Sequence, residues 1–210
     1  MSERRAYDAE GRRARAAERR EQVLAIARRL FLERGYGPTS LPAIAREAGV
    51  SVEYLHKTFE GKAGLVRAIY EQSLRGSGGV PAFQRSDDAQ AHEADAHALF
   101  RRLGTLLAEV SAFTIPMQRL MRDAAAGGDA SMIALWREVR DQNYARMLQN
   151  AQRVAARGFL REGVTVEQAA DVFWAFASAD LYESLVLDRG WTVERFADFA
   201  SSTFAAALLD

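Results

Sequence analysis

The spacing of apolar residues is helical along the chain, and this constrains the fold more than any other feature. Val23, Ile26, Ala27, Leu30 and Phe31 recur at intervals of three and four, which places them on one face of a helix. Similar spacing returns in later segments, and no segment alternates apolar and polar residues convincingly, as a half-buried strand does. The sequence therefore predicts an all-α fold.

Glycine and proline residues divide these helical stretches. In the N-terminal part, the expected boundaries are a stop at 35–38, a cap at Thr39 or Ser40, a stop at Gly49, a cap at Ser51 and a new helix from Gly61. Residues 76–91 have glycines, a proline and charges without a period, so we expect a loop there. Further helices are predicted at about 93–112, 115–126, 130–158, 166–187 and 192–208.

Length and charge distribution indicate two regions. A chain of 210 residues suffices for a small domain joined to a larger one. Residues 1–75 contain 15 Lys and Arg against 10 Asp and Glu, whereas the remainder contains 13 against 18. We expect a disordered or basic tail over residues 1–16, a basic N-terminal domain over 17–75 and a more acidic C-terminal domain over 76–210.

Composition excludes several classes of protein. The chain has no cysteine, so it has neither disulfides nor thiolate metal sites, which fits a reducing compartment. Its first twenty residues are charged from the start and lack the apolar segment of a secretory signal. No apolar run approaches the roughly 18 residues of a membrane helix. We expect a cytoplasmic protein without a membrane partner.

Residues 41–59 have the size and capping pattern of a helix-turn-helix. The small Ala45 lets the second helix cross close to the first, and Gly49 supplies a positive φ in the turn. Ser51 caps the second helix, whose free N–H groups then point toward a phosphate. The angle between the helices is filled by Ile44, Val50 and Leu55. An ordinary helical corner with a glycine stop is the alternative interpretation.

Residues 21–70 also resemble the N-terminal domain of TetR-family transcriptional regulators. The resemblance is carried by Leu30-Phe31, Arg34-Gly35-Tyr36, Thr39-Ser40-Leu41, Ile44-Ala45, Ala48-Gly49-Val50-Ser51, Leu55, Phe59, Lys62 and Leu65. It implies that residues 17–75 are a DNA-binding domain and that residues 76–210 are a ligand-binding and dimerisation domain. It also implies a homodimer, joined through its two C-terminal helices, that binds a palindromic operator in double-stranded DNA at the nucleoid. It further implies a repressor that a small apolar or amphipathic effector releases, with no cofactor. A helical ligand-binding or scaffold dimer with weak or lost DNA binding is the alternative.

Motif and resemblance together give the candidate DNA-binding residues. They are Thr39, Ser40, Ser51, Val52, Glu53, Tyr54, His56, Lys57 and Lys62. The family usually has a small residue, a small or hydroxylated residue and an aromatic at the positions of Glu53, Tyr54 and His56, so its base preferences are not carried over. Glu53 either stabilises the first helical turn and pairs with Lys57, or accepts a hydrogen bond from a cytosine.

The other candidates also have two interpretations. Lys57 and Lys62 either contact phosphates or are solvated, and the family uses a lysine at the position of Lys62 on the DNA backbone. Tyr54 either contacts a thymine methyl or phosphate or packs in the core, and His56 can donate to a phosphate. Thr39 and Ser40 can cap a helix and donate to a phosphate together. The arginines within 12–20, mixed with glutamates, form a solvated helix start, a disordered tail or a basic arm on DNA.

An apolar ligand cavity is expected in the C-terminal region, as the resemblance implies. Its candidate lining residues are Phe113, Met117, Met121, Trp136, Tyr144 and Trp174, with Leu120, Met147 and Leu148 beside them. Gln118 or Tyr144 would be a polar contact for the ligand, and core packing is the alternative for each residue.

A catalytic function is not expected. Asp88 with His92, and Glu93 with His97, have a spacing that can bind a metal, but the surroundings of His92 are polar and loop-like. The sequence contains no nucleophile elbow, phosphate loop or HExxH motif.

Overall fold

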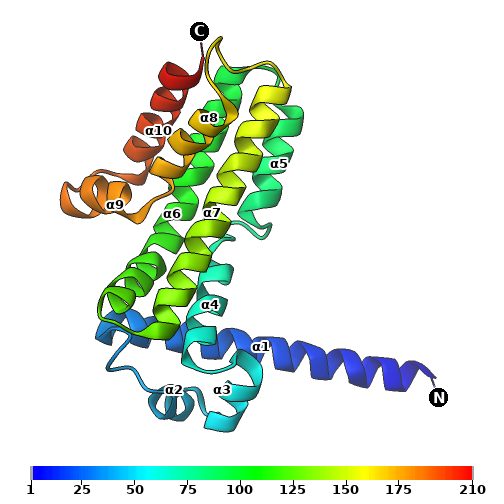
Figure 1. Cartoon of the computed structure of the whole chain (residues 1–210). Helices are drawn as coiled ribbons and strands as arrows, with labels where there is room; N and C mark the ends of the chain where they lie inside the picture. Colours follow the sequence, from blue (N-terminus) through cyan, green and yellow to red (C-terminus); the bar gives the residue numbers. More distant parts are fainter. Residues whose placement is uncertain (1, 210) are drawn as a thin grey trace. The chain divides into compact units, whose positions relative to one another are not determined.

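The computed structural model describes residues 2–209, except for the side chains of residues 2–10 and 12 (Figure 1). Within this range every regular element is a helix, which confirms the predicted all-α fold. The elements are α1 (Ser2–Arg34), α2 (Leu41–Ala48), α3 (Val52–Phe59), α4 (Lys62–Ser73), α5 (Ala82–His92), α6 (Ala96–Ala126), α7 (Ala130–Ala156), α8 (Val166–Phe176), α9 (Ala179–Tyr182), the π-helix η1 (Glu183–Asp188) and α10 (Val193–Leu208).

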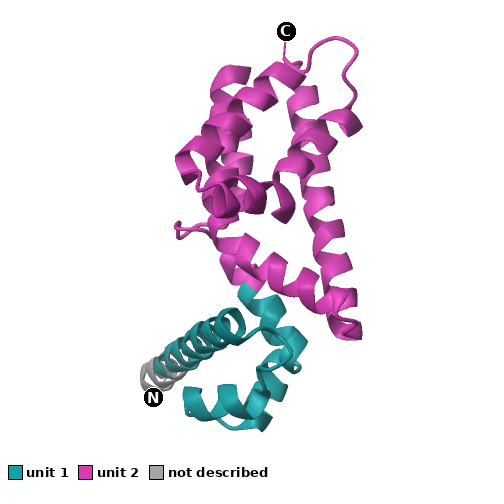
Figure 2. Ribbon diagram, turned by 90° about the vertical axis from the view of Figure 1, so that its left-hand side faces the viewer, with its two compact units in different colours: residues 1–69 teal, residues 70–210 magenta. Residues whose placement is uncertain are grey.

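The chain forms two compact units, residues 1–69 and residues 70–210 (Figure 2). The boundary falls inside α4, so this helix belongs to both units. Leu65, Val66 and Ile69 are fully buried on the N-terminal side of the boundary. Tyr70, the first residue of the second unit, is buried as well. The helix therefore carries core residues of both units along a continuous backbone.

In the first unit, the apolar stripe of α1 forms the core. Val23, Ala27, Leu30 and Phe31 are completely buried, as their helical spacing predicts. Phe31 also stacks on Tyr36, with ring centroids 6.0 Å apart. The described side chains of residues 13–19 are exposed, as in a solvated helix start.

Residues 76–91 are not a continuous loop, because α5 occupies residues 82–91 of this segment. The sequence hides this helix because its buried face includes the polar residues Ser86 and Gln90 beside Ala89. Gln90 Nε2 donates to Asn150 Oδ1 of α7 at 3.0 Å, so hydrogen bonding replaces apolar contact. Most buried polar groups are paired in this way, although Gln90 Oε1 has no hydrogen-bond partner among the described residues.

The predicted break between residues 112 and 115 is also wrong, because α6 runs through Pro116. Proline removes one N–H from the helix ladder, which usually costs stability. Here Ile115 and Met117 on either side are completely buried, and their packing favours an uninterrupted helix.

The segment predicted as one helix over 166–187 is divided into α8, α9 and η1. The division falls at Ser178, whose ψ of 148° is extended, and whose hydroxyl donates to Ala175 O at 2.7 Å. Such local side-chain bonds compete with the helical ladder. The buried residues of this segment therefore lie on α8 and α9, whereas η1 has none.

The core of the second unit centres on α6 and α10, which cross closely at Gly104. A Cβ on Gly104 would lie 2.2 Å from Ser201 Oγ and 2.9 Å from Ser201 N, so only glycine allows this approach. Phe173 and Phe204 meet edge to face, with centroids 5.0 Å apart. Edge-to-face contacts add to the stability that apolar burial provides. Within residues 2–209, no helix combines the length and apolar character needed to cross a bilayer.

Candidate nucleic-acid interface and ligand cavity

The turn between α2 and α3 has the geometry that its residues predict. Gly49 ends α2 in the left-handed region, at φ 64°, and its N–H donates to Ala45 O. Ser51 then caps α3, and its Oγ accepts the N–H of Tyr54 at 3.0 Å. Ile44 and Leu55 are completely buried in the angle between the two helices. The helix-turn-helix is therefore formed as a rigid corner rather than a flexible turn.

The helix α3 has one buried side and one polar side. Leu55 and Phe59 are buried. The side chains left exposed or half-buried are Thr58 and six candidate DNA contacts, Ser51, Val52, Glu53, Tyr54, His56 and Lys57. The start of α3 therefore presents polar side chains together with unpaired helix N–H groups, which is a suitable surface for a nucleic acid.

Glu53 lies in the first turn of α3, where the helix dipole stabilises a carboxylate. The sequence also suggests that Glu53 pairs with Lys57 one turn later, but no ion pair joins these two side chains among the described residues. Both side chains are exposed. The Glu53 carboxylate is thus available to an external hydrogen-bond donor.

Thr39 and Ser40 have different roles. Ser40 is the cap of α2, and its Oγ accepts the N–H of Ala43 at 3.3 Å. Thr39 is only 1 % exposed, and its hydroxyl is within bonding distance of Leu30 O and Gly35 O, at 3.1 and 2.8 Å. The expectation that the Thr39 hydroxyl donates to a phosphate is therefore corrected, because this hydroxyl is directed into the domain.

Lys62 opens α4 and is held against the preceding loop of the same unit. Its Nζ donates to Gly37 O at 3.2 Å and lies 4.0 Å from the centroid of the Tyr36 ring. These contacts hold the ammonium group beside the loop that leads into α2. Lys62 is thus positioned by the domain, whereas no hydrogen bond or ion pair within the described residues fixes the exposed Lys57.

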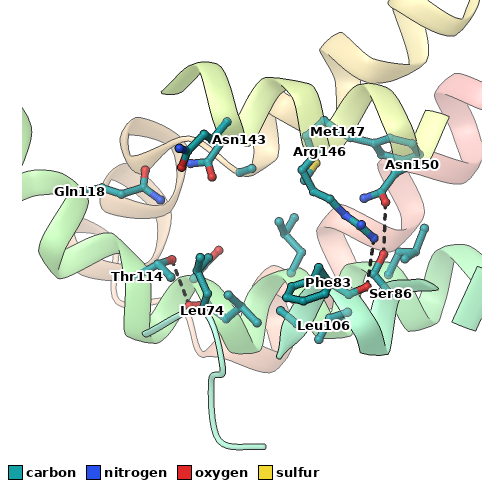
Figure 3. A pocket seen from close by; sticks show the side chains of 18 of the residues that line it. Leu74, Phe83, Ser86, Leu106, Thr114, Gln118, Asn143, Arg146, Met147 and Asn150 are labelled. Atoms are coloured by element: carbon teal, nitrogen blue, oxygen red, sulfur yellow. Dashed lines mark hydrogen bonds between the residues drawn. The ribbon is translucent and has the colours of Figure 1, made fainter. Parts of the chain in front are cut away.

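The second unit contains a cavity of about 310 Å³ between α5, α6 and α7, closed by residues of α4, α8 and α10 (Figure 3). It is lined by Tyr70, Leu74, Ala82, Phe83, Ser86, Leu103, Leu106, Leu107, Val110, Ser111, Thr114, Gln118, Gln142, Asn143, Arg146, Met147, Asn150, Phe173, Ala177 and Phe204. The volume is within the range of small-molecule sites, and the walls are mainly apolar with a few polar groups.

The cavity includes Gln118 and Met147 from the sequence analysis, but none of the six candidate lining residues. Met117 and Met121 are completely buried, and Phe113 is 37 % exposed. The other three, Trp136, Tyr144 and Trp174, lie on α7 and α8 around Arg140. The Arg140 guanidinium lies 5.8 Å from the Trp136 ring centroid and 5.1 Å from that of Trp174, which meets Tyr144 edge to face.

Charges at the cavity are paired. Arg146 donates to Phe83 O at 3.1 Å and forms an ion pair with Asp87, which also pairs with Arg153. Partial burial acts to raise the pKa of Asp87, but the hydrogen bonds and charges of both arginines outweigh it and hold this pKa below its ordinary value. Burial raises the pKa of Tyr70 to about 12, although its hydrogen bond to Asn143 acts to lower it. Near neutral pH, Asp87 is therefore ionised and Tyr70 is neutral.

Among the described residues, no group of three or more His, Asp or Glu side chains is arranged to hold a metal ion. Asp88 and His92 do lie together, with Oδ1 and Nδ1 3.1 Å apart, but both side chains are more than 70 % exposed. This pair is a surface contact between neighbouring turns of α5.

The comparisons with known proteins agree with this arrangement. Residues 23–69 match the family model described as bacterial regulatory proteins of the tetR family. A search among curated proteins found no significant match. Among solved structures, the SmeT–triclosan complex is 22 % identical, with 92 % of each chain covered and a TM-score of 0.70.

Two further solved structures are similar over nearly their whole length. A protein of Syntrophomonas wolfei, assigned to the TetR family of transcriptional regulators, is 21 % identical, with a TM-score of 0.72; the match covers 91 % of this chain and 96 % of that one. The regulator PfmR of Thermus thermophilus is 22 % identical, with a TM-score of 0.59 and coverage of 90 % and 95 %. Residues 23–69 thus match the N-terminal domain of the tetR family, and nearly the whole chain has a fold similar to that of these solved structures.

Proposed function

We propose that the protein is a dimeric transcription regulator that binds a palindromic operator and is released from it by a small molecule. The observation that carries this proposal is the polar, exposed side of α3, held by the Gly49 turn and the Ser51 cap. A helix fixed in this way can enter the major groove, where side chains read base edges. Its proposed DNA contacts are Ser40, Ser51, Val52, Glu53, Tyr54, His56, Lys57 and Lys62.

Dimerisation is proposed to use the outer sides of α8 and α10, which pack on each other within the chain. Phe199 is 38 % exposed although it is aromatic, and Ala175 and Ala206 are exposed on the same two helices. Two copies of this helix pair would form a four-helix interface with two-fold symmetry, as a palindromic operator requires.

The small-molecule effector is proposed to occupy the cavity in the second unit. The related SmeT structure was solved with triclosan, which supports a ligand-binding role for this fold. Tyr70 and Leu74 line the cavity and lie in or next to α4, the helix that begins at Lys62. A ligand that moves these side chains would favour dimers whose recognition helices no longer match two successive major grooves. Such a repressor would act in the cytoplasm, at the nucleoid.

The test is selection of duplexes from a random library with purified, ligand-free protein at moderate salt. We expect enrichment of an inverted repeat whose half-sites are about one helical turn apart, and affinity that falls steeply with salt. A folded dimer that enriches no sequence would contradict the proposal. That result would favour the alternative, a helical ligand-binding or scaffold dimer with weak or lost DNA binding.

A further inference from the structure

We propose that the cavity selects an uncharged ligand with a hydrogen-bonding head group, anchored by the amides of Gln118 and Asn143. This inference rests on the proposed effector role of the cavity and adds the chemical class of the effector. It is carried by a buried polar side chain without a hydrogen bond in the described structure, and by the ion pair that already engages Arg146 of the cavity wall.

Gln118 is the central observation. The residue is only 4 % exposed and lines the cavity, toward which its amide points in Figure 3. Within the described part of the chain, this amide makes no hydrogen bond. An amide on a cavity wall becomes costly when a ligand covers it without forming a hydrogen bond to it. A ligand that supplies both an acceptor and a donor would remove this cost.

Asn143 provides a second group at the same end of the cavity, on the facing helix α7 (Figure 3). Its Oδ1 accepts the Tyr70 hydroxyl at 2.9 Å, so its amide nitrogen is the group left to donate. The Gln118 amide can both donate and accept. Together the two amides fit a carbonyl, amide or hydroxyl head group. The apolar walls around Leu106, Val110 and Phe83 fit an aliphatic or aromatic body.

The wall charges argue against an ionised head group. Among the described residues of the wall, Arg146 is the only ionic side chain, and its guanidinium is already paired with Asp87, a carboxylate that it shares with Arg153. Tyr70 is neutral because its pKa is about 12. A carboxylate or ammonium group would therefore leave water without a free opposite charge to pair with, which is strongly unfavourable.

The first experiment compares three probes with the same alkyl chain: decanamide, decanoate and decylammonium. Their binding to the full-length protein is measured at neutral pH by calorimetric titration. We expect decanamide to bind at least about ten-fold more tightly than either ion, a difference of about 1.4 kcal/mol. An ion that binds as tightly as decanamide, or decanamide that does not bind, would overturn the inference.

Two variants test the two parts of the argument. Gln118→Leu should weaken decanamide binding roughly ten-fold, because a ligand amide then lacks its partner. Met147→Leu, which changes an apolar wall position elsewhere in the cavity, should not. Asp87→Asn frees the positive charge of Arg146 and should strengthen decanoate binding several-fold. The matched control is Asp88→Asn, which changes an exposed carboxylate on the same helix. Unchanged affinities in the first and third variants would contradict the proposal.

Folding and DNA binding are measured on the same samples. Circular dichroism shows whether Gln118→Leu is folded, and Asp87→Asn supplies an independent test because it leaves both amides intact. Operator binding without any probe tests the regulator function separately. Loss of probe discrimination with normal operator binding would refute only the ligand class, whereas absent operator binding with normal discrimination would refute only the regulator.

Discussion

At the scale of single residues, Glu53 is the position where this domain differs most from an ordinary phosphate-binding surface. It is exposed in the first turn of α3 and has no ion pair with Lys57 in the described residues. A carboxylate beside DNA lowers affinity in general, but it can accept a hydrogen bond from the N4 amino group of cytosine. The cost in affinity is then exchanged for discrimination at one base pair.

We predict that Glu53→Ala relaxes the preference for one base pair in each half-site. The loss of discrimination should be about 1–3 kcal/mol at that position, while binding to other sequences becomes tighter or stays equal. Duplex selection with the variant and the parent protein measures this directly. Glu60→Ala is the control, because it removes an exposed carboxylate from the other end of α3. An identical selected motif for Glu53→Ala and the parent would make the carboxylate purely structural.

Sequence reasoning at this scale works where a residue has one local task. The roles of Gly49 and Ser51 follow from φ and capping, which depend on neighbours in the chain. Thr39 and Ser40 are adjacent and chemically similar, so the sequence leaves the cap of α2 open between them. The structure distinguishes them because Thr39 turns into the core, where distant carbonyls accept its hydroxyl.

At the scale of helices, the crossing of α6 and α10 depends on the absence of one side chain. We predict that Gly104→Ala lowers the free energy of unfolding by about 1–3 kcal/mol, the usual cost of overpacking. The new Cβ meets the Ser201 backbone nitrogen at 2.9 Å, so the backbones of both helices must separate. Thermal unfolding measures the effect. Gly79→Ala is the control, because a Cβ there meets nothing within 4 Å, and equal melting temperatures for both variants would contradict the prediction.

Glu109 of α6 binds the segment that precedes α5 and the first turns of α5 itself. Its carboxylate accepts from the Arg85 guanidinium at 2.8 Å and from the Ser77 hydroxyl at 2.7 Å. Burial acts to raise the pKa of Glu109, but these hydrogen bonds and the Arg85 charge hold it below its ordinary value. A depressed pKa means that stability is present above about pH 4.3, the ordinary glutamate value. It is lost as the pH falls through the folded-state value.

We therefore predict that Glu109→Gln lowers stability by about 1 kcal/mol at neutral pH and has a smaller effect in acid. Urea unfolding at a series of pH values measures the difference from the parent protein. Glu71→Gln, at an exposed glutamate of the same unit, should follow the parent at every pH. The same destabilisation of Glu109→Gln at all pH values would show that the pair contributes through shape and not through charge.

At the scale of elements, the limits of the sequence also have physical causes. A helix such as α1 is predicted because one apolar face repeats along it. By contrast, α5 is buried through Ser86 and Gln90, which have no apolar period. The residues that line the cavity are harder still to predict from the sequence. Large apolar side chains are the obvious candidates for a lining, but a cavity forms where side chains from several helices fail to meet. Trp136 and Trp174 instead pack beside Arg140.

At the scale of the whole molecule, two-fold operator recognition requires a dimer. We predict that Phe199→Glu, which places a charge on the outer side of α10, converts the protein into a monomer. Sedimentation velocity measures the mass, and titration of a full operator should show binding weakened by about ten-fold or more, because two half-sites are no longer held together. Val80→Glu is the control, since Val80 is an exposed apolar residue of the same unit. A Phe199→Glu dimer would place the interface elsewhere.

The tryptophans of this chain have an unequal distribution that gives the molecule an optical label. All three, Trp136, Trp174 and Trp191, lie in residues 70–210, and each has an arginine guanidinium near its ring. Tyrosines, by contrast, occur in both units. Light absorbed by tryptophan is therefore emitted only from the unit that contains the cavity. In a ligand titration, tryptophan fluorescence therefore reports on the unit that contains the cavity. The fluorescence of a dye attached to the DNA reports operator binding in the same sample.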